Sequence, residues 1–307
     1  MQVIPSRVLR RRVLSALLCL FLLLSVVPAS RADAVTWRSL TVDTEAIYLD
    51  LGDLQVQNWP DFYDFLARLP ALKQVDMYNT RTDWKIVNEL HERFPNIEFG
   101  LTLRIGKHRL RTDATAFSTL YYEGDPTVGQ DEMAQVRFCK HLYALDLGHN
   151  RIRDLSFLYD LPELRVLIVA LCQLTDITPI GSLHHLEYLE LFHNKIEDLS
   201  PLADMPYLMD LNIVRNEVTD LSPLLHLTSL KRLWIHEYRY HGSHKTDPDM
   251  LADLQAALPD CHIDATSTST GGGWRNHPHY DVIKRMFKKQ VYEPFEDSDP
   301  ANLPEGL

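Results

Sequence analysis

The sequence is poor in cysteine, in glycine and in positive charge. Only four of its 307 residues are Cys and twelve are Gly. Four cysteines are too few for a disulfide framework, so stability must come mainly from a hydrophobic core. Lys and Arg total 31 against 42 Asp and Glu, a net charge of −11. This excess of acidic residues argues against binding nucleic acid through its phosphates.

The sequence motifs of common enzymes are also missing. The chain has no G-x-S-x-G, H-E-x-x-H or C-x-x-C. Residues 100–107 (GLTLRIGK) differ from a phosphate-binding loop, because five residues and not four separate the glycines. We therefore expect no catalytic residue, no cofactor and no small-molecule substrate. An enzyme with a site in the N-terminal half is only a remote alternative.

Histidine is abundant, and two clusters are candidate metal sites. A zinc site needs about four converging ligands. We expect solvated loop histidines and no metal in both clusters, which are His236, His241 and His244, and His277 and His279.

The N-terminus has the layout of a secretory signal. Four arginines precede an uncharged, almost wholly apolar run at residues 13–27, and Ala32-Asp33-Ala34 offers an A-x-A cleavage site. As a helix this run rises about 22 Å, less than the roughly 30 Å of a bilayer core. Residues 1–34 are thus expected to be a signal peptide of a secreted or cell-surface protein, with a net charge of −15 after cleavage. The alternative is an uncleaved membrane anchor through residues 13–27.

A 22-residue repeat is the strongest feature of the chain. Five copies of L-x-x-L-x-L begin at leucines in phase: Leu142, Leu164, Leu186, Leu208 and Leu230. In four copies, the third residue after the last apolar position is Asn or Cys. At this point the chain turns away from a strand, and a side chain here can form hydrogen bonds with buried backbone groups. We predict that these residues form a structural ladder: Asn150, Cys172, Asn194 and Asn216.

This pattern resembles the 22-residue class of leucine-rich repeat, as in bacterial internalin-like proteins, from residue 142 to about 237. The resemblance implies an α/β fold, a leucine-rich repeat solenoid shaped as a right-handed β/α horseshoe with a parallel sheet on its concave face. It also implies a non-catalytic protein-binding module. A weaker resemblance, at residues 94–120, is to the N-terminal parts of leucine-rich repeat proteins of anaerobic gut bacteria and implies no activity.

The flanks are expected to close the two ends of the solenoid, because an uncapped terminal repeat would expose its core. Residues 35–141 are predicted to be an N-terminal cap with irregular helical repeats, continuous with the regular repeats at 142–237. Residues 238–265 would form a C-terminal cap, and residues 266–307 a linker, a short amphipathic helix and a tail. Helices are expected at residues 60–69, 83–94, 131–140 and 249–258, and strands near 47–49, 75–77 and 261–263.

The outward positions of the repeats point to an interaction surface on the concave face. Apolar and aromatic residues occupy several of these positions and charged residues surround them, which is the composition of protein interfaces. We expect a protein or peptide partner there. Intramolecular cover by the C-terminal segment is the alternative, since Tyr280, Ile283, Met286 and Phe287 share one face of its helix. The predicted partner-binding residues are Val166, Ile168, Leu171, Tyr188, Glu190, Phe192, Asp210, Asn212, Arg215, Arg232 and Trp234.

Two consequences separate the hypotheses. If the concave face binds a partner, as we predict, Trp234→Ala and Tyr188→Ala should each weaken that binding by about 1–3 kcal/mol and leave the fold intact. If the chain is instead a membrane-anchored tethering protein, residues 13–27 should remain in the purified protein.

Overall fold

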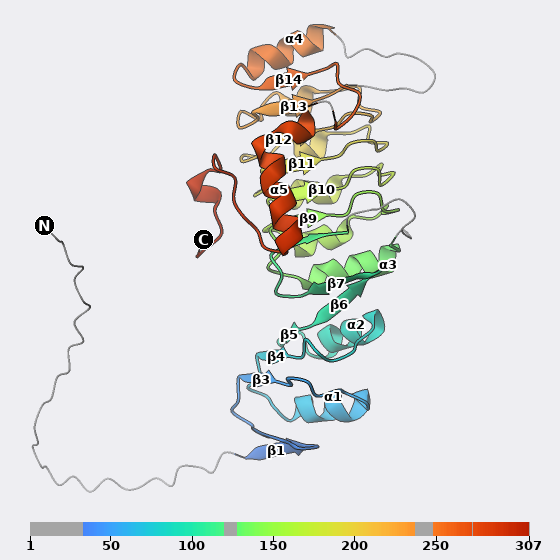
Figure 1. Ribbon diagram of the computed structural model, residues 1–307, viewed down its shortest axis with the longest axis vertical. Coiled ribbons are helices and arrows are strands. Elements are labelled where there is room, and N and C mark those ends of the chain that lie inside the picture. The colour runs from blue at the N-terminus through green and yellow to red at the C-terminus, as the bar shows by residue number, and fades with distance from the viewer. Residues whose placement is uncertain (1–32, 120–127, 237–247, 272, 307) are drawn as a thin grey trace, which may run out of the picture.

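The chain forms a long stack of strands, one above the next (Figure 1). The structure is a computed structural model that describes residues 33–119, 128–236, 248–271 and 273–306. Almost all of the predicted signal segment lies outside the described residues. Within the described part, none of the helices is both long enough and apolar enough to cross a membrane.

A parallel sheet of seven strands forms the main body, in the order β14-β13-β12-β11-β10-β9-β8. Strands of successive repeats are in register, so that Leu167 lies between Leu145 and Leu189. The predicted solenoid with a parallel sheet is therefore confirmed. The strands are β8 (Ala116–Ser118), β9 (Ala144–Asp146), β10 (Val166–Ile168), β11 (Tyr188–Glu190), β12 (Asp210–Asn212), β13 (Arg232–Trp234) and β14 (His262–Asp264).

The repeated leucines fill the interior of the solenoid. Leu164, Leu186 and Leu208 are fully buried, together with the leucines at the fourth position of each repeat. The chain returns on the other side of each of these repeats through a short 3-10 helix, which follows a recurring Asp. The helices are η2 (Ser156–Asp160), η3 (Thr178–Ser182), η4 (Ser200–Leu202) and η5 (Ser222–Leu224).

The recurring aspartates start these 3-10 turns by capping backbone N–H groups. Asp198 Oδ1 accepts from Ser200 N at 2.7 Å, and Asp220 Oδ1 accepts from Ser222 N at 2.8 Å. A carboxylate two residues before the N–H it accepts is an Asx turn, which fixes the local direction of the chain. The residues of each repeat thus determine both its strand and the 3-10 turn that leads the chain back to the next strand.

Asparagine side chains bind backbone groups of neighbouring repeats at the point where each strand ends. Asn194 Oδ1 accepts from the N–H groups of Cys172 and Leu174, and its Nδ2 donates to the carbonyls of Val169 and Leu191. Asn150 and Asn216 occupy the equivalent places, and all three are at most 5% exposed. The residue before each ladder position has a left-handed backbone, with φ values of 56–64°: His149, Leu171, His193 and Arg215.

The N-terminal region consists of longer, helical repeats, with Leu49 in register with Val75 as the strand pattern predicts. Its own parallel sheet has the order β3-β4-β5. The elements are β1 (Ala34–Trp37), β2 (Leu40–Asp43), β3 (Tyr48–Asp50), α1 (Trp59–Ala67), β4 (Gln74–Asp76), α2 (Trp84–Arg93), β5 (Glu98–Gly100), β6 (Thr102–Ile105), β7 (His108–Arg111), α3 (Gln130–Met133) and η1 (Ala134–Phe138).

Two features of this region differ from the predicted continuous solenoid. An antiparallel hairpin, β6-β7, turns through Gly106 at φ 59° and separates the three-stranded sheet from the seven-stranded one. The helix expected at 131–140 is α-helical for only one turn and then continues as a 3-10 helix. The first hairpin, β1-β2, closes the end of the stack, because Trp37 packs on Phe62 with ring centroids 4.9 Å apart.

The ladder gives a direct prediction of stability. Replacing Asn194 with Ala leaves the buried carbonyl of Val169 and the buried N–H groups of Cys172 and Leu174 without their partner, so we expect a loss of about 1–3 kcal/mol in the free energy of unfolding. Urea unfolding measures it. The matched control is Glu197→Ala, an exposed residue of the same repeat, which should change stability by less than about 0.5 kcal/mol. Equal midpoints for the two variants would contradict the ladder.

Candidate functional site

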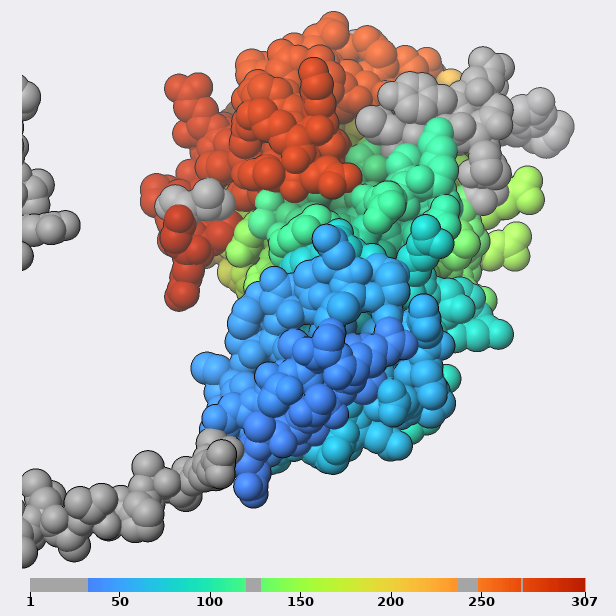
Figure 2. All heavy atoms as spheres, turned by 60° about the horizontal axis from the view of Figure 1, so that its bottom comes forward, coloured from blue at the N-terminus to red at the C-terminus, as the bar shows by residue number. Residues whose placement is uncertain are grey.

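The concave face of the seven-stranded sheet is covered by the end of the chain. We call residues 274–303 the strap; it contains η6 (Trp274–Asn276), α5 (Pro278–Lys289) and η7 (Pro300–Asn302). Figure 1 shows α5 lying across the stacked strands, and Figure 2 shows the red atoms of this segment packed against the green repeats. Strands β10 to β13, in which every residue is buried, are therefore covered on both faces.

A second hydrophobic core lies between the sheet and the strap, separate from the core inside the solenoid. Trp274 is fully buried at its centre, with ring centroids 5.2 Å from Tyr188 and 5.1 Å from Trp234. The apolar face of α5 supplies Ile283, Met286 and Phe287, as its sequence pattern predicts. Tyr292 and Phe295 continue this core beyond the helix.

Glu190 is the first polar anchor of the strap. Its side chain is fully buried, yet both carboxylate oxygens are paired. Oε2 accepts from Trp274 Nε1 at 2.8 Å and from Tyr188 OH at 3.1 Å, and Oε1 accepts from Arg275 at 3.0 Å. The strap thus covers this carboxylate and at the same time supplies it with an indole N–H and a guanidinium.

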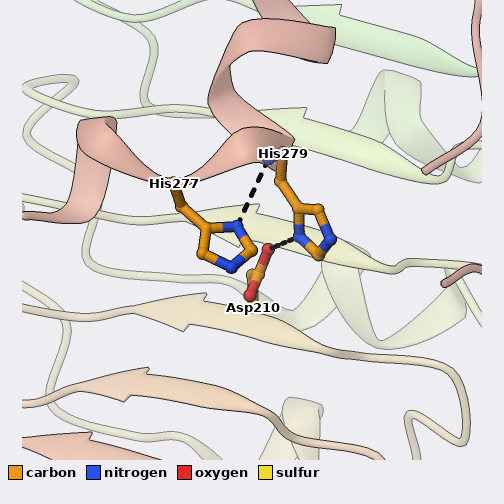
Figure 3. A group of neighbouring side chains, drawn as sticks. All are labelled: Asp210, His277 and His279. Carbon is orange, nitrogen blue, oxygen red and sulfur yellow. Dashed lines mark hydrogen bonds and ion pairs between the residues drawn. The ribbon is translucent and has the colours of Figure 1, made fainter. Parts of the chain in front are cut away.

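Asp210, on the next strand, is the second anchor (Figure 3). Arg232 Nε donates to its Oδ1 at 2.7 Å, and His279 Nδ1 lies 2.5 Å from its Oδ2. Burial acts to raise the pKa of Asp210, but the hydrogen bonds and charges of His279 and Arg232 outweigh it and lower that pKa. The carboxylate is therefore ionised and held between two cationic groups.

The far end of the strap binds two charged residues that sequence analysis did not single out. Arg165 is 2% exposed and donates from Nε to the carbonyl of Asn302 at 2.7 Å. Glu187 accepts from Asn302 Nδ2 at 2.7 Å and from the Ser298 hydroxyl at 2.6 Å. Burial raises the pKa of Glu187, against the effect of these two hydrogen bonds. The strap is thus held along its whole length.

The predicted partner-binding residues lie together on this face, but they are not open to solvent. Nine of them are buried, and only Leu171 and Arg215 are partly exposed. The expectation that Tyr188→Ala or Trp234→Ala would leave the fold intact is wrong, because both side chains are core residues at 0% and 4% exposure. The reason is physical: an apolar patch with a charged rim suits a segment of the same chain as well as a partner.

Asp210, His277 and His279 offer potential metal-ligand atoms within 4.8 Å of one another. These groups are already engaged. Asp210 is bonded to Arg232 and His279, and His277 Nδ1 accepts from the backbone N–H of His279 at 3.3 Å. A metal ion here would also stand beside the guanidinium of Arg232. The arrangement therefore suits a proton between Asp210 and His279 better than a metal. His241 and His244 of the other cluster lie outside the described residues.

The strap should contribute strongly to stability through Trp274. Trp274→Ala removes the centre of the second core, so we expect a loss of about 3–5 kcal/mol. Urea unfolding measures the loss, and limited trypsin digestion at Arg275 and Lys284 should become faster. Trp84→Ala, which truncates a Trp that is 41% exposed, is the control and should change both readouts little. Unchanged digestion of Trp274→Ala would mean that the strap does not depend on this anchor.

Comparisons with known proteins agree with the repeat architecture. The family described as "Leucine Rich repeats (2 copies)" matches residues 162–204, and "Leucine Rich repeat" matches residues 138–155. No curated protein sequence matches the chain.

Solved structures similar to this chain include two internalins of Listeria monocytogenes. Internalin F is 20% identical with a TM-score of 0.40, over 74% of this chain and 77% of that one. Internalin C2 is 23% identical with a TM-score of 0.36, over 62% and 82%. A leucine-rich repeat protein of Leptospira interrogans is 16% identical with a TM-score of 0.38, over 70% and 59%. From its stacked, in-register strands and the two family matches, the central part of this chain is identified as leucine-rich repeats.

Proposed function

We propose that the chain is a non-catalytic protein-binding module, and that its concave face binds a protein or peptide segment that takes the place of the strap. The observation that carries this proposal is the pairing of Glu190 and Asp210 with the strap. A short segment of chain enters the face through one buried Trp and satisfies two buried carboxylates, which is how an anchored peptide binds a protein.

The strap also indicates what kind of partner would fit. Glu190 and Asp210 have no exposed surface, and an unpaired buried carboxylate is strongly destabilising. A competing segment must therefore supply donors for both, as Trp274, Arg275 and His279 do. We infer a basic segment that contains an aromatic residue. The acidic net charge of the chain would favour the approach of such a partner.

The way the strap is attached supports exchange. It follows a Ser/Thr/Gly-rich stretch at residues 266–273, a composition typical of flexible linkers. Gly273 has φ 120°, a backbone conformation that other residues rarely adopt, and a Cβ there would lie 3.3 Å from the ring of Trp234. This glycine lets the chain turn from the linker onto the face.

The interface between the strap and the sheet, within the described part of the chain, also leaves some polar atoms without hydrogen bonds. Among the described residues, several buried polar atoms at this interface have no protein hydrogen-bond partner. A segment that paired them would gain an advantage over the strap, because each such atom costs about 1–3 kcal/mol. They are Asn212 Nδ2, Arg232 Nη2, Trp234 Nε1, Arg275 Nε and Tyr292 OH.

Export to the medium or the cell surface is part of the proposal and rests on the sequence of residues 1–34. The first hairpin begins at Ala34, so cleavage after this residue would leave the hairpin almost complete. The alternative is a membrane-anchored tether that retains residues 13–27. The N-terminal residue of the protein purified from its native cell decides between them: Val35 supports export, and Met1 supports an anchor.

Strap exchange tests the binding site itself. A specific protease sequence replaces residues 268–271, the linker is cut, and a labelled peptide covering residues 273–304 is added. We expect the cut strap to remain bound and the labelled peptide to replace it over time. A peptide with Trp274→Ala should compete about 100-fold less well, because the loss of a buried Trp corresponds to about 3 kcal/mol or more.

The matched control peptide carries Val291→Ala, since this side chain is 53% exposed. It should compete as well as the unchanged peptide. If the unchanged peptide does not enter at a large excess, or if both substituted peptides compete equally, the face is not an exchangeable peptide site.

A further inference from the structure

His279 has an unusual position in the docked strap, because a carboxylate lies against each nitrogen of its ring. Nδ1 is 2.5 Å from Asp210 Oδ2, and Nε2 is 2.7 Å from Asp297 Oδ1. The residue is 6% exposed, so water has little access to the ring. Phe295 stacks on it with ring centroids 4.3 Å apart and holds its plane.

The protonation state follows from these two contacts. A neutral imidazole has one N–H and one nitrogen lone pair, and an ionised carboxylate only accepts hydrogen bonds. With a neutral ring, one carboxylate would face a lone pair in a buried site. Both contacts are favourable only when the two ring nitrogens are protonated. The geometry therefore requires His279 to be a cation when the strap is docked.

The other charged groups around the ring come from every element packed on it. Asp210 on β12 is paired with Arg232 on β13, and Asp297 beyond α5 is paired with Lys231 at 2.6 Å. His277, at the start of α5, has a lowered pKa because of burial and the charge of Arg232, so it adds no positive charge near neutral pH. Protonated His279 thus joins the sheet carboxylate Asp210 to the strap carboxylate Asp297.

We propose that protonation of His279 locks the strap onto the concave face, so that pH controls access to the partner site. This inference rests on the function proposed above. It names the regulation of the same site: an acidic medium keeps the face closed, and a neutral to alkaline medium opens it to a competing segment.

The direction of the effect follows from the pKa of His279. Burial acts to lower this pKa, but the hydrogen bonds and charges of Asp210 and Asp297 outweigh burial and raise it above the ordinary value of about 6.5. A raised pKa in the docked state means that the contribution to docking is complete below about pH 6.5. It is lost as pH rises through the docked value. Over that interval the docking constant falls by up to about tenfold per pH unit.

Two other carboxyl groups on the sheet, the buried Glu187 and the half-buried Asp146, act in the same direction at lower pH. The pKa of Glu187 is raised by burial, and that of Asp146 is raised by burial to about 6. The pKa values of Asp210 and Asp297 are lowered, so these residues stay ionised in mildly acidic solution. A dependence above pH 6.5 therefore does not come from these four carboxyl groups, whereas protonated His279 bridges two of them.

The experiment measures exchange of the cut strap between pH 5.5 and pH 8.5. In the unchanged protein, the strap should exchange at least tenfold faster at pH 8.5 than at pH 6. In His279→Gln, exchange should be fast at all pH values, with less than a twofold change above pH 6.5. His193→Gln is the matched control, since this exposed histidine of the same face should leave the pH dependence unchanged. Equal pH dependence in the unchanged protein and in His279→Gln would overturn the proposal.

Nitrogen-15 NMR of the uncut chain tests the protonation state without any exchange. Both ring nitrogens of His279 should carry protons at pH 7, and Asp297→Asn should move the titration of His279 to lower pH. A neutral ring at pH 6.5 would refute the proposed lock and leave the proposed binding site untouched. A strap that never exchanges, with a charged His279, would instead refute the binding site.

Discussion

The parallel sheet carries buried apolar clusters on both of its faces, and this constraint shapes the rest of the molecule. Inside the solenoid, each repeat covers the leucines of the next. Outside, Val166, Tyr188 and Trp234 form an apolar patch beside the carboxylates of Glu190 and Asp210, and water would not cover this patch favourably. Something must lie on that patch, and the chain supplies it from its own C-terminal end.

The two cores differ in how specific their contacts are. Leucine packing and asparagine pairing recur in each repeat, so one contact resembles the next. The outer core is not repetitive, because each buried charge on the sheet meets a different group of the strap. Glu190 meets Trp274 and Arg275, and Asp210 meets His279. Such singular pairings fix the register of the strap on the sheet. They also give the surface a chemical preference, which is what a binding site requires.

The concave face of the sheet holds the strap and is also the proposed binding site, so the stability of the molecule and its proposed function are connected. A surface that holds an internal segment by one aromatic anchor and a few charged hydrogen bonds is also suited to an external segment of similar chemistry. Competition between the two then sets the apparent affinity, because the strap reduces the fraction of molecules with an open face. Any influence that loosens the strap would increase binding of a partner in proportion.

The solenoid could be predicted from the sequence because its determinants are local and periodic. Leucines in phase, ladder asparagines and capping aspartates each act within one repeat or between neighbours. The hairpin β6-β7 could not be separated from the expected stack, because its alternation of apolar residues is that of any strand. The concave patch was predictable as a surface that needs a partner.

The sequence indicated the C-terminal segment only as the alternative cover of this patch, and the individual contacts of the strap could not be derived from it. The hydrogen bond between Arg165 and Asn302 joins residues 137 positions apart, and no periodicity connects them. Arg165 and Glu187 occupy places where charged residues are normally exposed, so their burial gives no signal. The apolar face of α5 and the Trp that precedes it are the available indications.

A double-mutant cycle between Trp274 and Glu190 tests the central claim most directly. Trp274→Phe removes the indole N–H, and Glu190→Gln replaces the carboxylate that accepts its hydrogen bond with a neutral amide. Urea unfolding gives the free energy of unfolding of each single variant and of the double variant. If the strap lies on the concave face through this contact, the two losses should be coupled by about 1.5–3 kcal/mol. Losses that add to within about 0.5 kcal/mol would show that the two residues do not meet, and that the strap lies elsewhere.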